Sequence, residues 1–195
     1  MAKKNQLTTS DHLEYSEFEK LLNALHADKD YFWELYARLA FCTACRGGDI
    51  LNFQWIDILD KEEATIVEQK TGKARRITFN KSVRNTIHKL WELLDKPNRN
   101  EFIFKSNKYD GHISIQHVNR KLKEFRFKYK LNISHFSTHT FRKTFGRYVY
   151  DNAPNKAEAL ILLNKILNHS NLQVTKTYIG ITQEEIRSIY DSIAF

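Results

Sequence analysis

Apolar residues recur at helical spacing near the beginning of the chain. In the segment YSEFEKLLNALH, residues 15–26, four of them fall at i, i+3, i+4 and i+7, which predicts a helix with one buried face. Ser16 and Glu19 have the spacing of a capping box, so the pattern also predicts that Ser16 caps this helix. The four apolar positions are Phe18, Leu21, Leu22 and Leu25.

The helical pattern continues on both sides of a break at the sequence RGGD. A second helix is predicted over about residues 29–43 and a third over DILNFQWIDI, residues 49–58. Asn155 and Glu158 are placed to cap a later helix. The later helices are predicted over residues 82–94, 114–131, 139–152, 156–167 and 184–195.

A different pattern occupies residues 63–79, EATIVEQKTGKARRITF. Two short runs with β-branched residues flank a Lys-Thr-Gly-Lys turn, in which glycine supplies the backbone freedom that a tight turn needs. This predicts a β-hairpin, and EFIFKS, residues 101–106, reads as a strand or a buried connection. We therefore expect one domain over residues 1–195, mainly α with a small antiparallel β-hairpin, an α+β fold.

Charge and composition narrow the class of protein. The 31 basic and 23 acidic residues give a formal net charge of +8, which favours a polyanionic partner, most often nucleic acid. No apolar run approaches a membrane span and the first residues lack a signal-peptide core, so we expect a cytoplasmic protein with no membrane partner.

Cys42 and Cys45 lack a second cysteine pair to complete a zinc site, so we expect reduced, mostly buried thiols and no metal.

Arg46 is the first candidate for chemistry. It precedes two glycines and a predicted helix start, where a guanidinium and backbone amides could bind an anion together. Alternatively, Arg46 pairs with Asp49 or Asp57 and the glycines only end a helix. Taken alone, the second explanation is the better one.

Two further cationic groups follow along the chain. Lys70 and Lys73 flank the hairpin turn, where exposed lysines usually serve solubility. His139 and Arg142 lie three residues apart and are neighbours on one helix face. That pair suits an anion bound between them or a neutral histidine that exchanges a proton, although a structural histidine is the commoner case.

The last candidate pair is His169 and Tyr178, in the segment LNHSNLQVTKTYIG. A tyrosine hydroxyl has a pKa near 10, so ionising it at neutral pH costs about 4 kcal/mol. As a nucleophile it needs a local base or a strong positive potential. The arginines, lysine and histidines named above could supply that field.

Together these residues form an ordered set that resembles the tyrosine recombinases, the phage integrase family. The boxes read TACRGGDILNFQWID, EQKTGKARRITF, HTFRK and LNHSNLQVTKTY. The family's lysine lies in a K-T-G-like turn, which points to Lys70, with Lys73 as the alternative. The matched positions are Arg46, Lys70, His139, Arg142, His169 and Tyr178.

The chain departs from the family pattern at four positions. Ala44 and Asn168 replace usual glycines, Lys143 replaces the histidine that follows Arg142, and Asp49 replaces a glutamate. The family usually also carries an N-terminal DNA-binding clamp domain, which we do not expect in this chain. None of the departures removes a group that the resemblance makes catalytic.

The resemblance implies a site-specific DNA recombinase of the integrase or invertase type, encoded by a prokaryotic cell, a phage or another mobile element. Tyr178 would attack the scissile phosphate and give a 3′-phosphotyrosine, with no metal, nucleotide or other cofactor. Arg46 and Arg142 would stabilise the transition state, and Lys70 would protonate the leaving 5′ oxygen. The remaining implied roles are proton transfer for His139, phosphate binding for His169 and support of Arg46 or its neighbours for Asp49.

Double-stranded DNA is the expected partner, in a homotetramer on paired sites or together with another recombinase. The alternatives are an accessory DNA-binding protein on the same fold that exchanges no strands, and a type IB topoisomerase. The basic helix over residues 114–131 could enter the major groove or be a solvated basic face. The candidate DNA-binding residues are Lys73, Lys121, Lys123, Arg126, Lys128 and Lys143.

Overall fold

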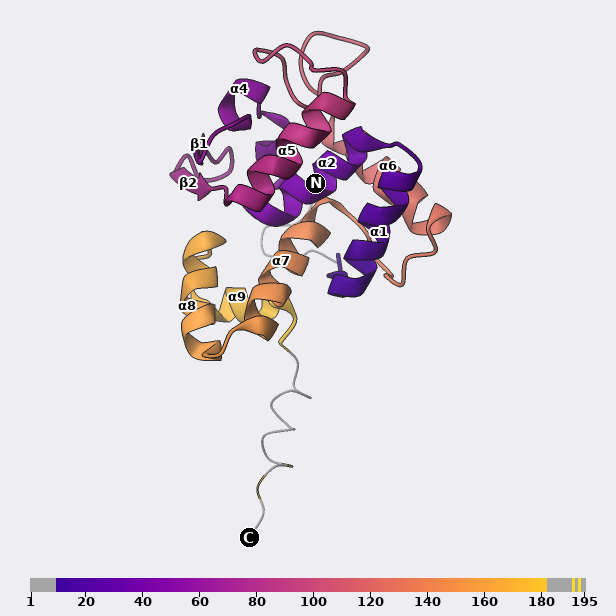
Figure 1. Ribbon diagram of the computed structural model, residues 1–195. Helices are drawn as coiled ribbons and strands as arrows, with labels where there is room; N and C mark the ends of the chain where they lie inside the picture. Colours follow the sequence, from indigo (N-terminus) through magenta and orange to yellow (C-terminus); the bar gives the residue numbers. More distant parts are fainter. Residues whose placement is uncertain (1–9, 182–190, 192, 194–195) are drawn as a thin grey trace.

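The computed structural model describes residues 10–181, 191 and 193 (Figure 1). Helices dominate this part of the chain and its two strands form one small antiparallel sheet, so the predicted α+β class is confirmed. The helix predicted over residues 184–195 falls almost entirely outside the described residues. Within them, no helix is long and apolar enough to cross a bilayer. The elements are α1 (Tyr15–Ala27), α2 (Tyr31–Thr43), α3 (Gly47–Leu51), α4 (Trp55–Ile58), β1 (Glu63–Val67), β2 (Ala74–Thr78), α5 (Lys81–Leu93), α6 (Ile115–Lys128), α7 (Thr138–Asn152), α8 (Lys156–Ile166) and α9 (Leu172–Ile179).

The main hydrophobic core surrounds α2, which packs against α1, α5 and α7. Tyr36 of α2 is fully buried and meets the rings of Phe104 and Phe141 edge-on, with centroids 5.2 and 6.1 Å apart. Edge-to-face packing of this kind suits aromatic rings because a positive edge meets a negative face. The first turn of α7 is thereby fixed against the centre of the domain.

A second, smaller core lies where α8 and α9 meet the end of α2. Leu163, Leu167 and Ile179 are completely buried there, together with Ala44 just after α2. Figure 1 shows α7 running from the main body of helices towards the α8–α9 pair. The two cores therefore meet along α7 and at the end of α2, and the candidate residues gather at this junction.

The predicted hairpin is confirmed. Glu63 pairs with Thr78 and Val67 with Ala74 in an antiparallel register, and residues 68–73 form the turn. Gly72 has φ +66°, a left-handed value that glycine adopts without a steric penalty. Ala64 and Ile77, directly opposite each other, are the buried positions of the two strands.

The predicted helix over residues 15–26 is present as α1, but its predicted cap is wrong. Glu14 precedes α1 and makes no side-chain capping bond, so Ser16 lies inside the helix and does not cap it. The entry of the chain is instead fixed by Leu13, which is 1% exposed and donates its backbone N–H to Thr144 Oγ1 at 2.9 Å. A tertiary contact with α7 thus overrides the local capping pattern.

The single helix predicted over residues 49–58 is in fact two short helices, α3 and α4. Between them, Phe53 accepts a backbone hydrogen bond from Ile103 at 2.9 Å, and Gln54 forms a bridge with Phe102. Residues 101–106 are thus a mostly buried connection with isolated bridges, one of the two outcomes left open. Pairing with it breaks the helix, and Asp57 then restarts the helix by accepting the Gln54 backbone N–H at 2.8 Å.

Gly146 sets how closely α9 packs on α7. A Cβ atom at this position would lie 2.7 Å from Ile179 Cγ2, which is too close for any real contact. We expect Gly146→Ala to lower the free energy of unfolding by about 1–3 kcal/mol, because the small core is already filled. Urea titration measures this.

Gly48→Ala is the matched control for that substitution. Its added Cβ would meet Gln69 Oε1, the end of a flexible side chain, at 2.8 Å. It should therefore cost less stability than Gly146→Ala, and equal losses would contradict the packing argument.

Candidate active site

The six residues of the ordered set come from separate parts of the fold and converge. Burial first, and then the positive charges of Arg142 and Arg46, lower the pKa of His169 to about 4, with Lys70 acting in the same direction. Burial and the same cations also lower the pKa of His139. Lys70, the preferred lysine, is thus among the charges that act on both histidines. Arg46 precedes α3, Lys70 lies in the hairpin turn, His139 and Arg142 lie in the first part of α7, His169 lies between α8 and α9, and Tyr178 lies on α9.

Arg142 is buried among the carboxyl ends of two helices. Its side chain donates to the carbonyl of Ala44, at the end of α2, at 2.5 Å and to the carbonyl of Leu167, at the end of α8. Helix ends carry unpaired carbonyls and a partial negative charge, so a guanidinium is a fitting partner. The Arg142 side chain is only 2% exposed, which holds it in one orientation.

The two departures from the family's usual glycines occur at these same helix ends. Ala44 has φ +49° and Asn168 has φ +47°, both in the left-handed region. Glycine occupies this region freely, whereas a residue with a Cβ is strained there by roughly 1–2 kcal/mol. The backbone geometry that favours glycine is therefore kept in this chain, although the glycines are not.

At each of these two helix ends, Arg75 binds the carbonyl one residue before the carbonyl that Arg142 binds. It donates to Thr43 O and to Ile166 O, both at 2.9 Å, and to Cys45 Sγ at 2.7 Å. It joins β2 of the hairpin to α2 and α8. Arg75 was not predicted from the sequence, since an arginine in a basic hairpin resembles a solvated charge.

Glu68 is an acidic residue of the site that was not predicted from the sequence. It is completely buried, and Oε2 lies 2.7 Å from Arg46 Nη1, while Thr71 and Asn168 donate to the same oxygen at 2.9 and 2.8 Å. Burial alone raises the pKa of Glu68, but hydrogen bonds from Asn168, Arg46 and Thr71 outweigh it and lower the pKa to about 2. Its position at the start of the hairpin turn that holds Lys70 was the one available signal.

These contacts correct the expected pairing of Arg46. Its partner is Glu68, whereas Asp57 accepts a backbone N–H within α4. Asp49 is buried, and its Oδ1 accepts the backbone N–H of Gln69 at 2.9 Å. Asp49 thus supports the hairpin turn next to Lys70. The same turn contacts Arg46 through Glu68.

His169 is oriented through a hydroxyl of α9. Its Nδ1 lies 3.1 Å from Thr175 Oγ1, and the same oxygen accepts a hydrogen bond from the Asn164 amide at 3.0 Å. Because Thr175 Oγ1 already accepts from Asn164, its own proton is available for Nδ1. That arrangement favours a neutral imidazole whose Nε2 carries the proton and can donate.

Tyr178 lies on a helix that the sequence analysis did not predict. Asn171 caps α9 by accepting from Val174 N at 3.0 Å, and Gly180 ends it with φ +75°. The Tyr178 ring contacts the His169 ring edge-on at 4.9 Å, and Lys143 Nζ lies 5.3 Å from its centroid. Burial raises the pKa of Tyr178, and the charges of Arg142 and Arg46 oppose this rise.

The residues predicted to bind DNA are not equally available. Lys143 is half-buried, donates to the Ser10 carbonyl at 2.6 Å and lies over the Tyr178 ring, so it belongs to the site. Lys121 pairs with Glu124 at 2.8 Å and Lys128 with Asp28 at 2.6 Å. Arg126 donates to a backbone carbonyl, while Lys73 and Lys123 are exposed.

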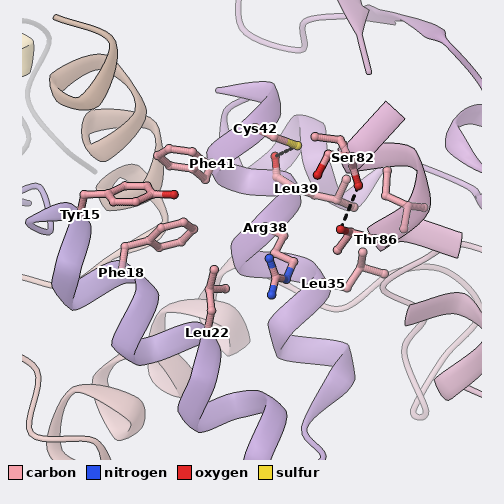
Figure 2. A pocket seen from close by; sticks show the side chains of 12 residues that line it. Tyr15, Phe18, Leu22, Leu35, Arg38, Leu39, Phe41, Cys42, Ser82 and Thr86 are labelled. Carbon is pink, nitrogen blue, oxygen red and sulfur yellow. Dashed lines mark hydrogen bonds between the residues drawn. The ribbon is translucent and has the colours of Figure 1, made fainter. Parts of the chain in front are cut away.

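A separate pocket of about 180 Å³ lies between α1, α2 and α5 (Figure 2). It is largely apolar, with Phe18, Leu22 and Leu39 among its walls, and no residue of the ordered set lines it. Cys42 borders this pocket and Cys45 is fully buried; both thiols are free, as predicted.

Ion pairs hold most of the buried charged atoms of the candidate site. Arg46 Nη1 lies 2.7 Å from Glu68 Oε2, and Arg75 Nε lies 3.8 Å from Glu68 Oε1. Buried charges are stable when they are paired in this way. The described part of the chain holds no cluster of three metal-binding side chains.

The lowered pKa of His169 makes the stability of the fold dependent on pH. The unfolded imidazole takes a proton near pH 6.5, but the folded one only near pH 4, so stability is full above pH 6.5 and falls through this window. We expect the free energy of unfolding to fall by about 1–2 kcal/mol between pH 7 and pH 5. His169→Gln should reduce this loss in urea titrations at both pH values. A wild-type pH dependence in His169→Gln would contradict the assignment.

The sequence and the fold of this chain were both compared with those of known proteins. Residues 11–185 match the model described as the phage integrase family. The probable integrase/recombinase YoeC of Bacillus subtilis (strain 168) is 33% identical over 162 residues, which cover 83% of each chain. The structure of XerA recombinase is similar with a TM-score of 0.73 at 18% identity, over 98% of this chain and 68% of that one. The lambda integrase catalytic core is similar with a TM-score of 0.60 at 21% identity, over 82% of this chain and 91% of that one.

The match to the family model spans nearly the whole described chain, and the similar structures share its fold. The expected tyrosine recombinase catalytic-domain fold is therefore confirmed. The protein belongs to the phage integrase family, the tyrosine recombinases.

Proposed function

We propose that this protein is a site-specific DNA recombinase that cuts and rejoins DNA through a covalent bond between Tyr178 and a 3′ phosphate. The observation that carries the proposal is the burial of the Tyr178 hydroxyl in the positive field of Arg142 and Arg46. A phenol in a positive field can ionise to a nucleophile, and guanidinium groups suit a phosphate. An accessory protein that exchanges no strands would have no need of this arrangement.

In the proposed cleavage step, Tyr178 Oη bonds to the scissile phosphorus as the bond from phosphorus to the 5′ oxygen breaks. The phenolic proton passes to His139, whose lowered pKa keeps the ring neutral at pH 7 and able to accept it. Lys70 gives a proton to the departing 5′ oxygen, which leaves as a hydroxyl. Reversal of the step with another 5′ hydroxyl rejoins a strand, and no external energy source is required.

The remaining groups stabilise the charge that develops on the phosphate. Arg46 and Arg142 are held by the hairpin and by helix ends, so they are preorganised for the non-bridging oxygens. His169, oriented by Thr175, donates from Nε2 to one of these oxygens. Preorganised donors of this kind are each worth about 10²–10³ in rate.

The partner in this proposal is double-stranded DNA, which the net charge of +8 favours. Residues 1–195 act as one catalytic domain, and four copies, or this protein with another recombinase, bring two sites together. Exposed cations such as Lys73 and Lys123 contact the DNA backbone, and this binding weakens with salt.

The deciding experiment captures the covalent intermediate. Wild-type protein is mixed with random-sequence duplexes that carry a nick near the centre, so that a released fragment cannot rejoin. We expect a complex that survives denaturing detergent, with the nucleotide on the tryptic peptide 177–187, which contains Tyr178. Sequencing the retained DNA gives the target site. DNA binding without an adduct would favour an accessory protein, and relaxation of any plasmid without sequence preference would favour a topoisomerase.

A further inference from the structure

One buried carboxylate oxygen joins three segments of the proposed active site. Glu68 Oε2 lies 2.7 Å from Arg46 Nη1, and it accepts hydrogen bonds from Thr71 Oγ1 at 2.9 Å and from Asn168 Nδ2 at 2.8 Å. Arg46 is itself in the ordered set, Thr71 is next to Lys70 in the turn, and Asn168 is next to His169. No other carboxylate in the described part of the chain accepts from all of these segments.

The contacts are costly to break because Glu68 is charged and has no exposed surface. A buried charge that loses a partner is strongly destabilised, so the carboxylate holds its three neighbours firmly. Arg75 Nε lies 3.8 Å from the second oxygen, Oε1, and adds a further positive charge behind it. The left-handed backbone of Asn168, at φ +47°, fits the same explanation, since its amide bond to Glu68 offsets the strain.

From this geometry we infer that Glu68 is a positioning residue for strand cleavage, which rests on the function proposed above. Its carboxylate holds Arg46, the Lys70 turn and the His169 loop in register, so that phosphate contacts and proton donation to the 5′ oxygen occur together. It also reduces the positive charge at the site where the phosphate binds. Removing the Glu68 charge therefore lowers the cleavage rate without weakening DNA binding.

The main variant is Glu68→Gln, which keeps the shape and removes the charge. On a nicked duplex of the sequence captured by the wild type, we expect single-turnover cleavage to fall about 10- to 100-fold. DNA affinity should be equal to that of the wild type or greater. The matched control is Glu63→Gln, an exposed glutamate of the same hairpin that lies 3.6 Å from Arg76 and should cleave like the wild type.

A second variant, Thr71→Val, guards against a folding defect because Thr71 is on the exposed turn. It removes one donor to Glu68 and a weaker acceptor for Asn168, at 3.3 Å, and we expect a loss of about 3- to 10-fold in cleavage. A duplex with sulfur in place of the scissile 5′ oxygen needs no proton on its leaving group, so it should restore most of the cleavage lost by Thr71→Val. Glu68→Gln should recover only partly, because Arg46 is displaced as well.

The outcomes separate this inference from the proposed function. If the wild type forms no adduct, the proposed function fails. If the wild type cleaves and folded Glu68→Gln cleaves equally well, or loses cleavage only in parallel with DNA affinity, the inference is wrong. Full recovery of Glu68→Gln on the sulfur substrate would also overturn it, since Arg46 and His169 would then be positioned without the carboxylate.

Discussion

Replacing Tyr178 with phenylalanine is expected to abolish the covalent adduct with nicked DNA while leaving the fold intact. The substitution removes the only atom proposed to bond to phosphorus, so no slower route through the same residue remains. The Tyr178 hydroxyl interacts with Arg142, which keeps its bonds to the carbonyls of Ala44 and Leu167 when the hydroxyl is removed, so no buried charge is left without a partner. The phenyl ring can keep its contacts with His169 and Lys143.

Two measurements check this result. Adduct formation is read on a denaturing gel, and DNA binding by a mobility shift, where Tyr178→Phe should match the wild type. Tyr150→Phe is the matched control, because Tyr150 also carries a cation over its ring, Lys156 at 5.1 Å, and has no proposed chemistry. An adduct with Tyr178→Phe, or the loss of it with Tyr150→Phe, would place the nucleophile elsewhere.

Arg142→Lys is the second substitution with a large expected effect, on the chemistry and on stability together. Lysine keeps the charge but cannot bind the carbonyls of Ala44 and Leu167 while also presenting N–H groups to a phosphate. We expect cleavage to fall by about 10³-fold or more, and the free energy of unfolding to fall by about 2–4 kcal/mol. Single-turnover cleavage and urea titration measure the two losses.

Arg75→Lys separates these two effects. Arg75 binds the neighbouring carbonyls of Thr43 and Ile166, at the same two helix ends, but has no place in the proposed contacts to phosphate. It should lose a similar amount of stability and much less cleavage. If both variants lose cleavage in the same proportion, Arg142 acts only through the fold.

Local spacing predicted the parts of the site that lie within one element. His139 and Arg142 are neighbours because helix geometry makes them so, and Asn155 caps α8 because its side chain accepts from Ala157 and Glu158 close by. The hairpin also followed from local pattern, including the glycine in its turn. The failures, at Ser16 and in the helix over residues 49–58, occurred where contacts from distant segments displaced a weak local preference.

The sequence by itself determined which kinds of side chain are present, in what order, and on which helices and turns most of them lie. That was enough to identify the family and to select Tyr178, Arg46 and Arg142 as candidates. Only the tertiary structure decided what holds them, because Glu68 meets Asn168 across 100 positions and Arg142 meets Ala44 across 98. A charged residue in a hairpin is normally solvated, and its burial depends on helix ends that no local pattern can bring to it.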